Sequence, residues 1–168
     1  CYNPPSMAKK KPEKPKNLSP RIANRRAFHD YHIGEKLEVG IVLKGSEVKS
    51  IRNGQVSLAE GFAMIEPDTM EMWLHNVEIS PYTHAGPQHQ HEPKRRRKLL
   101  AKKREIRTIY DKHIVKGTTL VPLAMFFTRG KIKLEIGVGT GKKAFDKRQD
   151  MKKRDADREI RRSMSKRM

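Results

Sequence analysis

The sequence predicts a mainly β, α+β fold: a small antiparallel β-barrel with helices packed outside it. Three observations support this prediction. Several short β-branched and aromatic runs are punctuated by glycine. The last of them alternates strictly between apolar and charged residues, as a half-buried hairpin strand does. One longer stretch has helical spacing of its apolar residues. At 168 residues, the chain has the length of one domain with tails.

The first half of the predicted barrel contains strands and at least one short helix. Residues 28–33 and 37–43 are rich in β-branched and aromatic side chains and are predicted strands. Residues 46–52 suit a short helix that ends near Asn53-Gly54. The Ser-x-x-Glu pattern at 57–60 is typical of a capping box and predicts another helical turn. Residues 70–79 are a predicted strand, and the proline-rich stretch 80–93 is a predicted loop.

The second half predicts the main helix and a β-hairpin. Residues 94–116 place Leu99, Ile106 and Tyr110 on one helical face, and Gly117 supplies a C-terminal stop. Residues 118–127 and 131–138 are predicted strands joined by Arg129-Gly130. In the second strand Ile132, Leu134, Ile136 and Val138 should face one side.

Composition divides the chain into a core-forming middle and two basic tails. Residues 1–23 are rich in Lys and Pro, bury almost nothing, and should be disordered; Met7 is the expected start of translation. Residues 24–138 are the only stretch able to form a core. Residues 139–168 should be disordered in the free protein but are competent to form a helix, with a thin apolar stripe at Ala156, Ile160 and Met164.

Charge points to a polyanionic partner. The formal net charge is +19, and it is unevenly distributed: residues 28–93 carry net −6, and the segments on either side are basic. No window approaches the roughly 18 apolar residues of a membrane span. The single cysteine, Cys1, excludes an intrachain disulfide framework.

The run from Lys94 to Lys98 places five cations in succession, which repel one another unless phosphates neutralise them. A nucleic acid is favoured over a membrane surface, because few apolar residues remain for a membrane-facing side.

Motifs for nucleotide, metal and catalytic chemistry are incomplete. Gly137, Gly139 and Gly141-Lys142 resemble a phosphate loop, but two of the required positions fail, so a flexible joint is the better interpretation. His84, His89 and His91 share one loop but lack a second ligand set, which argues against zinc and favours an ordinary polar loop. Glu47 is the acid of special interest, and the alternative interpretation is a surface carboxylate paired with Lys49 or Arg52.

Longer strings of residues carry a family resemblance. They are Gly40-Ile41-Val42-Leu43-Lys44-Gly45-Ser46-Glu47-Val48-Lys49-Ser50-Ile51-Arg52, Asn24-Arg25-Arg26-Ala27, His91-Glu92-Pro93, Arg97-Lys98-Leu99-Leu100, Leu120-Val121-Pro122-Leu123 and Gly141-Lys142-Lys143-x-x-Asp146-Lys147-Arg148. In this order and spacing, from about Asn24 to the C-terminus, the sequence resembles the small protein B (SmpB) family, which binds bacterial tmRNA.

The resemblance implies an OB-fold-like barrel, a non-enzymatic RNA-binding protein without cofactors, and a cytoplasmic location. Its implied partners are the tRNA-like domain of tmRNA and the ribosome, with elongation factor Tu present indirectly through the charged tmRNA. The implied activity is delivery of tmRNA to stalled ribosomes for peptide tagging and release. The tail would sense the vacant mRNA channel and become helical there.

The resemblance and the charge pattern together give two sets of candidate residues. The expected RNA-binding set is Asn24, Arg26, Glu47, Lys49, Arg95, Arg97, Lys98, Leu100, Lys102, Lys131 and Lys133. Lys102 departs from the Asn or His common in the family, and its charge could supply a phosphate contact instead. The expected decoding-centre set is Gly141, Lys142, Lys143, Asp146, Lys147 and Arg148.

A different class of function remains open at this stage. Charge alone would also fit a structural ribosomal protein or a general RNA chaperone. Such a chaperone should bind tRNA and tmRNA alike at fixed salt, so RNA selectivity separates the two hypotheses.

Overall fold

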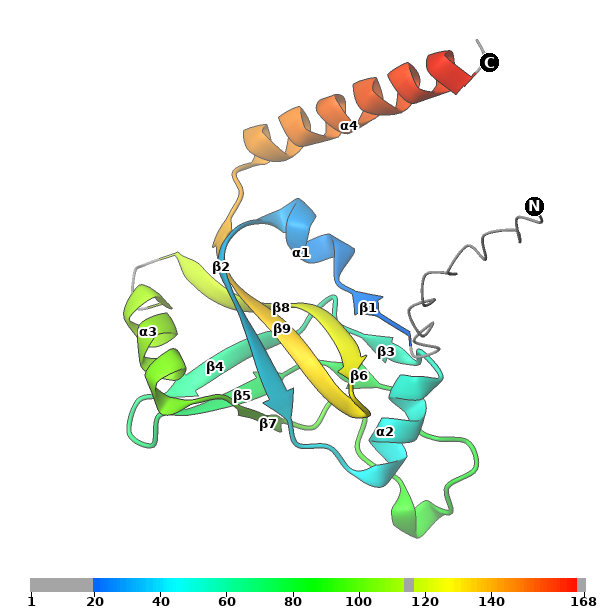
Figure 1. Cartoon of the computed structure of the whole chain (residues 1–168), viewed down its shortest axis with the longest axis vertical. Coiled ribbons are helices and arrows are strands. Elements are labelled where there is room, and N and C mark those ends of the chain that lie inside the picture. The colour runs from blue at the N-terminus through cyan, green and yellow to red at the C-terminus, as the bar shows by residue number, and fades with distance from the viewer. Residues whose placement is uncertain (1–19, 114–116, 166–168) are drawn as a thin grey trace, which may run out of the picture.

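The computed structural model describes residues 20–113 and 117–165 and shows a β-barrel with helices around it (Figure 1). The helices are α1 (Arg25–Asp30), α2 (Gly45–Arg52), the 3-10 turn η1 (Pro87–His89), α3 (Lys103–His113) and α4 (Ala144–Ser165). The strands are β1 (Ile22–Ala23), β2 (Tyr31–Ile41), β3 (Val56–Ser57), β4 (Phe62–Glu66), β5 (Glu71–His75), β6 (Glu78–Ile79), β7 (Arg97–Leu100), β8 (Thr118–Thr128) and β9 (Lys131–Gly141).

Strand pairing closes the main sheet on itself. The order is β8-β4-β5-β7-β2-β9, and β9 pairs again with β8, so these six strands form a ring in which every pairing is antiparallel. Strand β1 adds to the outside of β8, and β3 pairs with β6 in a separate ribbon. Closure removes the open edges at which sheets associate. The α+β, barrel-like fold class is confirmed.

The barrel interior is filled by alternate residues of the strands. Met72 and Leu74 of β5 are fully buried, as are Leu134 and Ile136 of β9. Helix α2 adds Ile51 and helix α3 adds buried isoleucines, so both helices pack onto this core. The alternation predicted for residues 131–138 is therefore confirmed, as is the hairpin turn. There Arg129 and Gly130 both have positive φ, which suits the twist of a tight connection.

The predicted helix 94–116 is wrong in its first part. Residues Arg97–Leu100 form strand β7, in which Leu99 pairs with Met72 on one side and Ile41 on the other. Pairing of this segment with strands on both sides outweighs the helical spacing of Leu99, Ile106 and Tyr110. The helix proper, α3, begins at Lys103. Residues 114–116 lie outside the described part of the chain.

Three other local predictions also need correction. Phe28 belongs to helix α1 and not to a strand, because Asn24 caps that helix through a hydrogen bond from the Ala27 amide. The Ser-x-x-Glu pattern at 57–60 forms a strand end and a turn, not a helix. The predicted strand 70–79 is two strands, separated at Asn76, whose φ of 54° interrupts extended backbone. The helix predicted at 46–52 is confirmed as α2.

The barrel is longer at both ends than residues 24–138. Strand β1 begins at Ile22, and β9 continues to Gly141. Gly137 and Gly139 are packed strand positions and not a flexible joint: a Cβ on Gly137 would lie 2.7 Å from Ile33 Cγ2, and one on Gly139 would lie 3.1 Å from Tyr31 Cβ.

Helix α4 follows β9 and projects away from the barrel beyond α1 (Figure 1). Disorder of this tail in the free protein stays a prediction, which amide exchange between 146 and 165 would test. The predicted N-terminal disorder falls mainly on residues 1–19, outside the described residues.

Candidate RNA interface

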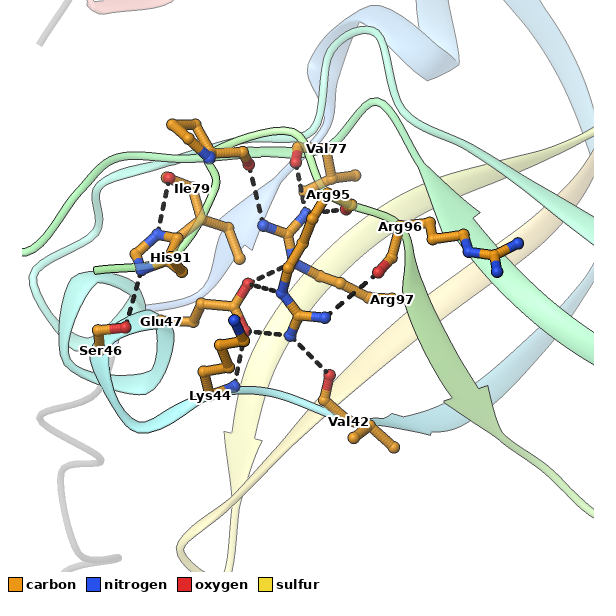
Figure 2. A network of polar contacts seen from close by, with 11 residues as sticks. Val42, Lys44, Ser46, Glu47, Val77, Ile79, His91, Arg95, Arg96 and Arg97 are labelled. Atoms are coloured by element: carbon orange, nitrogen blue, oxygen red, sulfur yellow. Dashed lines mark hydrogen bonds and ion pairs between the residues drawn. The ribbon is translucent and has the colours of Figure 1, made fainter. Parts of the chain in front are cut away.

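A buried carboxylate lies beside the predicted RNA-binding segment. Glu47, in the first turn of α2, is fully buried and accepts a hydrogen bond from the Lys44 amide at 2.7 Å. Its Oε1 accepts from Arg95 Nε at 2.9 Å and Arg97 Nε at 2.8 Å, and its Oε2 accepts from Arg95 Nη2 at 2.5 Å. Figure 2 shows the three side chains converging from α2 and the start of β7. One carboxylate therefore ties two segments about 50 residues apart to each other.

Arg97 uses every one of its guanidinium nitrogens. Besides the bond to Glu47, Nη1 donates to Val77 O at 2.7 Å and Arg95 O at 3.0 Å, and Nη2 donates to Pro93 O at 2.9 Å. A fully buried charge is tolerated only with this kind of complete pairing. Arg97 thus anchors β7 to the β5–β6 connection and to the loop before it.

His91 locks the same loop to α2. Its Nε2 lies 3.0 Å from Ile79 O, and its Nδ1 lies 2.9 Å from Ser46 Oγ. A carbonyl oxygen can only accept, so in the neutral ring Nε2 carries the proton and Nδ1 accepts from the hydroxyl. His91 is buried and structural, whereas His84 and His89 are exposed. Across residues 20–113 and 117–165, no three His, Cys, Asp or Glu residues are grouped as a metal site would require.

The ionisation of Glu47 reflects competing effects. Burial favours the neutral acid, but the bonds from Arg95, the Lys44 amide and Arg97 outweigh it, and the pKa of Glu47 lies below its ordinary value of 4.5. Burial lowers the pKa of Arg97 and its contact with Glu47 opposes that effect. The network is therefore an ion pair at neutral pH, with one carboxylate between two guanidinium groups.

The lowered pKa of Glu47 predicts acid sensitivity. Its contribution to folding is fully present above pH 4.5 and is lost as the pH falls through the lower folded-state pKa. We expect urea unfolding of the Glu47→Gln variant to depend less on pH below about pH 4.5 than that of the natural chain, by at most ~1.4 kcal/mol per pH unit. Equal slopes for the Glu47→Gln variant and the natural chain would contradict the assignment.

Three residues of the expected RNA-binding set are not on the surface. Glu47 and Arg97 are 0% exposed, and Asn24 is 4% exposed. Asn24 Nδ2 donates to Leu58 O and Pro122 O, so its side chain ties α1 to the barrel. The expectation that these side chains present themselves directly to RNA needs correction. Because they hold surface segments in place, any effect of their substitution on RNA binding would be indirect. The burial of these three side chains depends on contacts with residues distant in the sequence, so no short stretch of sequence predicts it.

Other members of the expected set do meet at one place. Leu100 of β7 is half exposed and lines an open apolar depression, with Lys131 and Lys133 from the start of β9 on its rim. Lys102 lies beside it, in the adjoining hollow that Leu100 and Lys133 also line. We call this the Leu100 groove. Its remaining lining, which the sequence prediction did not single out, is Gly40, Ile41, Leu43, Val48, Gly130 and Ile132.

The groove combines apolar floor and positive rim. Lys133 pairs with Glu38, whereas Lys102 and Lys131 form no ion pair with any carboxylate in the described chain. Lysines without a carboxylate partner can bind RNA phosphates, and exposed apolar side chains can pack against base faces. The groove therefore suits RNA.

The remaining predicted RNA-binding cations lie elsewhere. Arg26 pairs with Asp30 on α1 at 3.3 Å. Lys49 lies over the ring of Tyr82, 5.2 Å from its centroid. Lys98 pairs with Glu71 on the outside of the barrel, and Arg95 is held by Glu47 with a fifth of its side chain exposed.

The predicted tail residues begin where β9 ends. Gly141 is the last residue of β9, and the Lys142 amide donates to Asp30 O at 2.9 Å. Asp146 lies 3.8 Å from His32 Nε2, near the start of α4. Lys143 and Arg148 are exposed. The backbone of Lys147 is helical, and its side chain lies outside the described part.

No helix within the described residues is both long enough and apolar enough to cross a membrane.

Comparison with known proteins assigns the chain to a family. Residues 21–166 match the SmpB protein family. A protein of Carboxydothermus hydrogenoformans named SsrA-binding protein is 55% identical over 84% of this chain and 93% of its own length. Another of that name, from Latilactobacillus sakei, is 47% identical over 96% of this chain and its whole length. A chain in the solved structure "tmRNA-SmpB: a journey to the center of the bacterial ribosome" is 46% identical, with a TM-score of 0.63 over 75% of this chain and 87% of that one. The chain therefore belongs to the SmpB protein family.

Proposed function

We propose that this protein binds tmRNA through the Leu100 groove and carries it to stalled ribosomes for trans-translation. The observation that carries the proposal is the meeting of Leu100, Lys102, Lys131 and Lys133 at one groove, in a chain of the SmpB family. The SsrA-binding relatives and the tmRNA-SmpB structure support the choice of RNA. The protein acts by binding and positioning RNA and is not an enzyme.

The groove suits a folded RNA better than a bare strand of phosphates. Lysines supply charge without fixed direction, so they hold the backbone and favour no base. Leu100, 53% exposed, offers apolar area that gains from covering an unstacked base or a sugar edge. The lysines at the rim would supply most of the affinity, and the apolar floor would select RNA by its shape.

The Glu47 network prepares this surface without touching RNA. Arg97 and Leu100 lie in the same four-residue strand, and the network fixes that strand against α2. Leu43, just before α2, and Val48, next to Glu47 on α2, both line the groove, and the Lys44 amide between them donates to Glu47. Replacing Glu47 would therefore weaken tmRNA binding by disturbing the groove.

The tail is proposed to act at a separate site. Its motif from Gly141 to Arg148 matches the family segment that enters the decoding centre and the empty mRNA channel. A basic helix of the α4 type would compete with downstream mRNA for an anionic channel. Elongation factor Tu would join through the charged tmRNA, and the cytoplasm would be the site of action.

A salt titration tests the groove. We expect the double variant Lys102→Ala, Lys131→Ala to bind tmRNA more weakly and with a shallower dependence on salt. Each lost phosphate contact should reduce the slope of log K against log salt by roughly 0.7–0.9. A filter-binding series across salt concentrations gives the slope.

The control changes one lysine that already has a partner. Lys112→Ala removes one positive charge from α3, where Lys112 pairs with Glu35. The control should keep the natural slope. An unchanged slope in the double variant would place the RNA elsewhere, and equal affinity for tRNA and tmRNA in the natural protein would favour a general RNA chaperone. Arg97, although it belongs to the expected RNA-binding set, is unsuitable for this test because reversing a buried charge would unfold the barrel.

A further inference from the structure

A second surface lies outside the barrel on strands β4, β5 and β7. Successive residues of these strands alternate between core and exterior, and the outward residues align across the strands. Met64 pairs with Trp73, and Trp73 pairs with Lys98. Phe62 pairs with His75 one step along. We call these residues, together with Arg96, the Trp73 face.

The face carries a cation stacked on an indole. The guanidinium carbon of Arg96 lies 4.8 Å from the Trp73 ring centroid, and Lys98 Nζ lies 5.9 Å from it. In Figure 2 the Arg96 side chain points away from the Glu47 network into which Arg95 and Arg97 point. Stacking on the ring holds the planar guanidinium in place while leaving its edges able to bind an anion.

The charge of Arg96 is available to a ligand. Its side chain is exposed, and within residues 20–113 and 117–165 no carboxylate lies within ion-pair distance of it. Lys98 differs, because Glu71 on the same face compensates it. Glu66 is the other acid pointing outward from these strands, and it pairs across β4 and β5 with Glu71. Arg96 is therefore the cation that can attract a phosphate.

The aromatic area is flat and partly open. Phe62 and His75 stack with centroids 5.3 Å apart and planes 12° from parallel. Met64 beside them is 51% exposed. Trp73 Nε1 is buried without an acceptor among the described residues. An N–H without a partner is a cost at this position, so the advantage of tryptophan here lies in its ring area.

We infer that the Trp73 face binds unpaired nucleotides of RNA, one base stacking on the Arg96–Trp73 pair and Arg96 holding a neighbouring phosphate. Stacking on aromatic rings and on arginine planes is how proteins grip unpaired bases. The surface continues from the Leu100 groove, because Lys98 and Leu100 are alternate residues of β7 on its outer side. The inference deepens the proposed RNA binding by adding a site for single-stranded RNA next to the groove.

The chain contains one tryptophan, so its fluorescence reports this face directly. We expect saturable quenching of Trp73 when the full chain is titrated with an unpaired ten-nucleotide polyuridylate, whose bases stack little on one another. Arg96→Gln should weaken oligonucleotide binding, measured by anisotropy of a labelled strand, and reduce the quenching. Trp73→Leu should weaken binding roughly 5- to 100-fold, as loss of one stacked base does, while Trp73→Phe should retain most of it.

The control Arg52→Gln removes one exposed charge from α2 and leaves the Trp73 face intact. It should bind the oligonucleotide more tightly than Arg96→Gln does. Oligonucleotide binding without a change in Trp73 fluorescence, or equal losses from Arg96→Gln and Arg52→Gln, would overturn the inference. Trp73→Phe binding as weakly as Trp73→Leu would also overturn it. Failure of tmRNA selectivity at the groove, with Trp73 quenching intact, would instead contradict only the proposed function.

Discussion

Replacing Glu47 with alanine should lower the free energy of unfolding by about 3–5 kcal/mol, the cost typical of leaving a buried charge without its partner. Arg97, which is 0% exposed, would keep its positive charge with three carbonyl contacts and no carboxylate bonded to it. Arg95 would lose both of its bonds to the carboxylate. Urea unfolding followed by circular dichroism measures the change.

The matched control is Glu38→Ala. Glu38 also pairs with a cation, Lys133, but at the barrel surface, so its loss should cost less than about 1 kcal/mol. A double variant, Glu47→Ala with Arg97→Met, should be less destabilised than the two single changes added together, because no lone buried charge remains. Similar effects of Glu47→Ala and Glu38→Ala would contradict the buried ion pair.

Local patterns predicted the elements whose residues decide their own structure. The helix at 46–52 has its own apolar spacing and a terminal Asn53-Gly54, and the hairpin has Arg129-Gly130 between two alternating runs. Both lie in the structure as α2 and as β8–β9. The closed order of the strands could not be obtained in this way, because it depends on pairings between segments distant in the chain.

The basic run shows why part of the site was not predictable. In sequence, Arg95, Arg96 and Arg97 are three equivalent cations. In the structure they point to three environments: partly exposed on Glu47, stacked on Trp73, and fully buried. Arg95 and Arg97 point into the Glu47 network and Arg96 points away from it, just before and at the start of β7 (Figure 2). A hydrophobicity pattern cannot detect such a change of direction within a run of charged residues.

The partners of Glu47 were also not predictable from its local sequence. Its local neighbours, Lys49 and Arg52, suggested a surface ion pair. Its partners are 48 and 50 residues away, brought there by the pairing of β7 with β2. The family resemblance singled out Glu47 as a residue of the RNA-contacting surface, whereas the packing buries its side chain in ion pairs with Arg95 and Arg97.

Replacing Asp146, Lys147 and Arg148 together with alanine should leave tmRNA affinity within about 1 kcal/mol, because at most a few exposed electrostatic contacts change. It should nonetheless abolish tagging on stalled ribosomes. The two effects should separate because the groove and the tail motif lie at opposite ends of the β2–β9 pair. Gly40 pairs with Lys133 at the groove, and Tyr31 pairs with Gly141 at the tail. Eight residues of extended strand place these ends about 26 Å apart.

A tmRNA titration paired with in vitro tagging on a truncated message separates the two activities. The control replaces Asp157, Arg158 and Arg161 with alanine, which makes the same net charge change farther along α4 and leaves the matched motif intact. We expect the control to tag better than the motif variant, because the motif and not the helix charge is proposed to engage the decoding centre. Helix α4 contacts the barrel beside α1, away from the groove, so RNA held at Leu100 should not sense the motif substitutions. If tmRNA affinity instead fell in proportion to tagging, the groove and the tail would form one continuous RNA-binding surface, and delivery and channel sensing could not be assigned to opposite ends of the barrel.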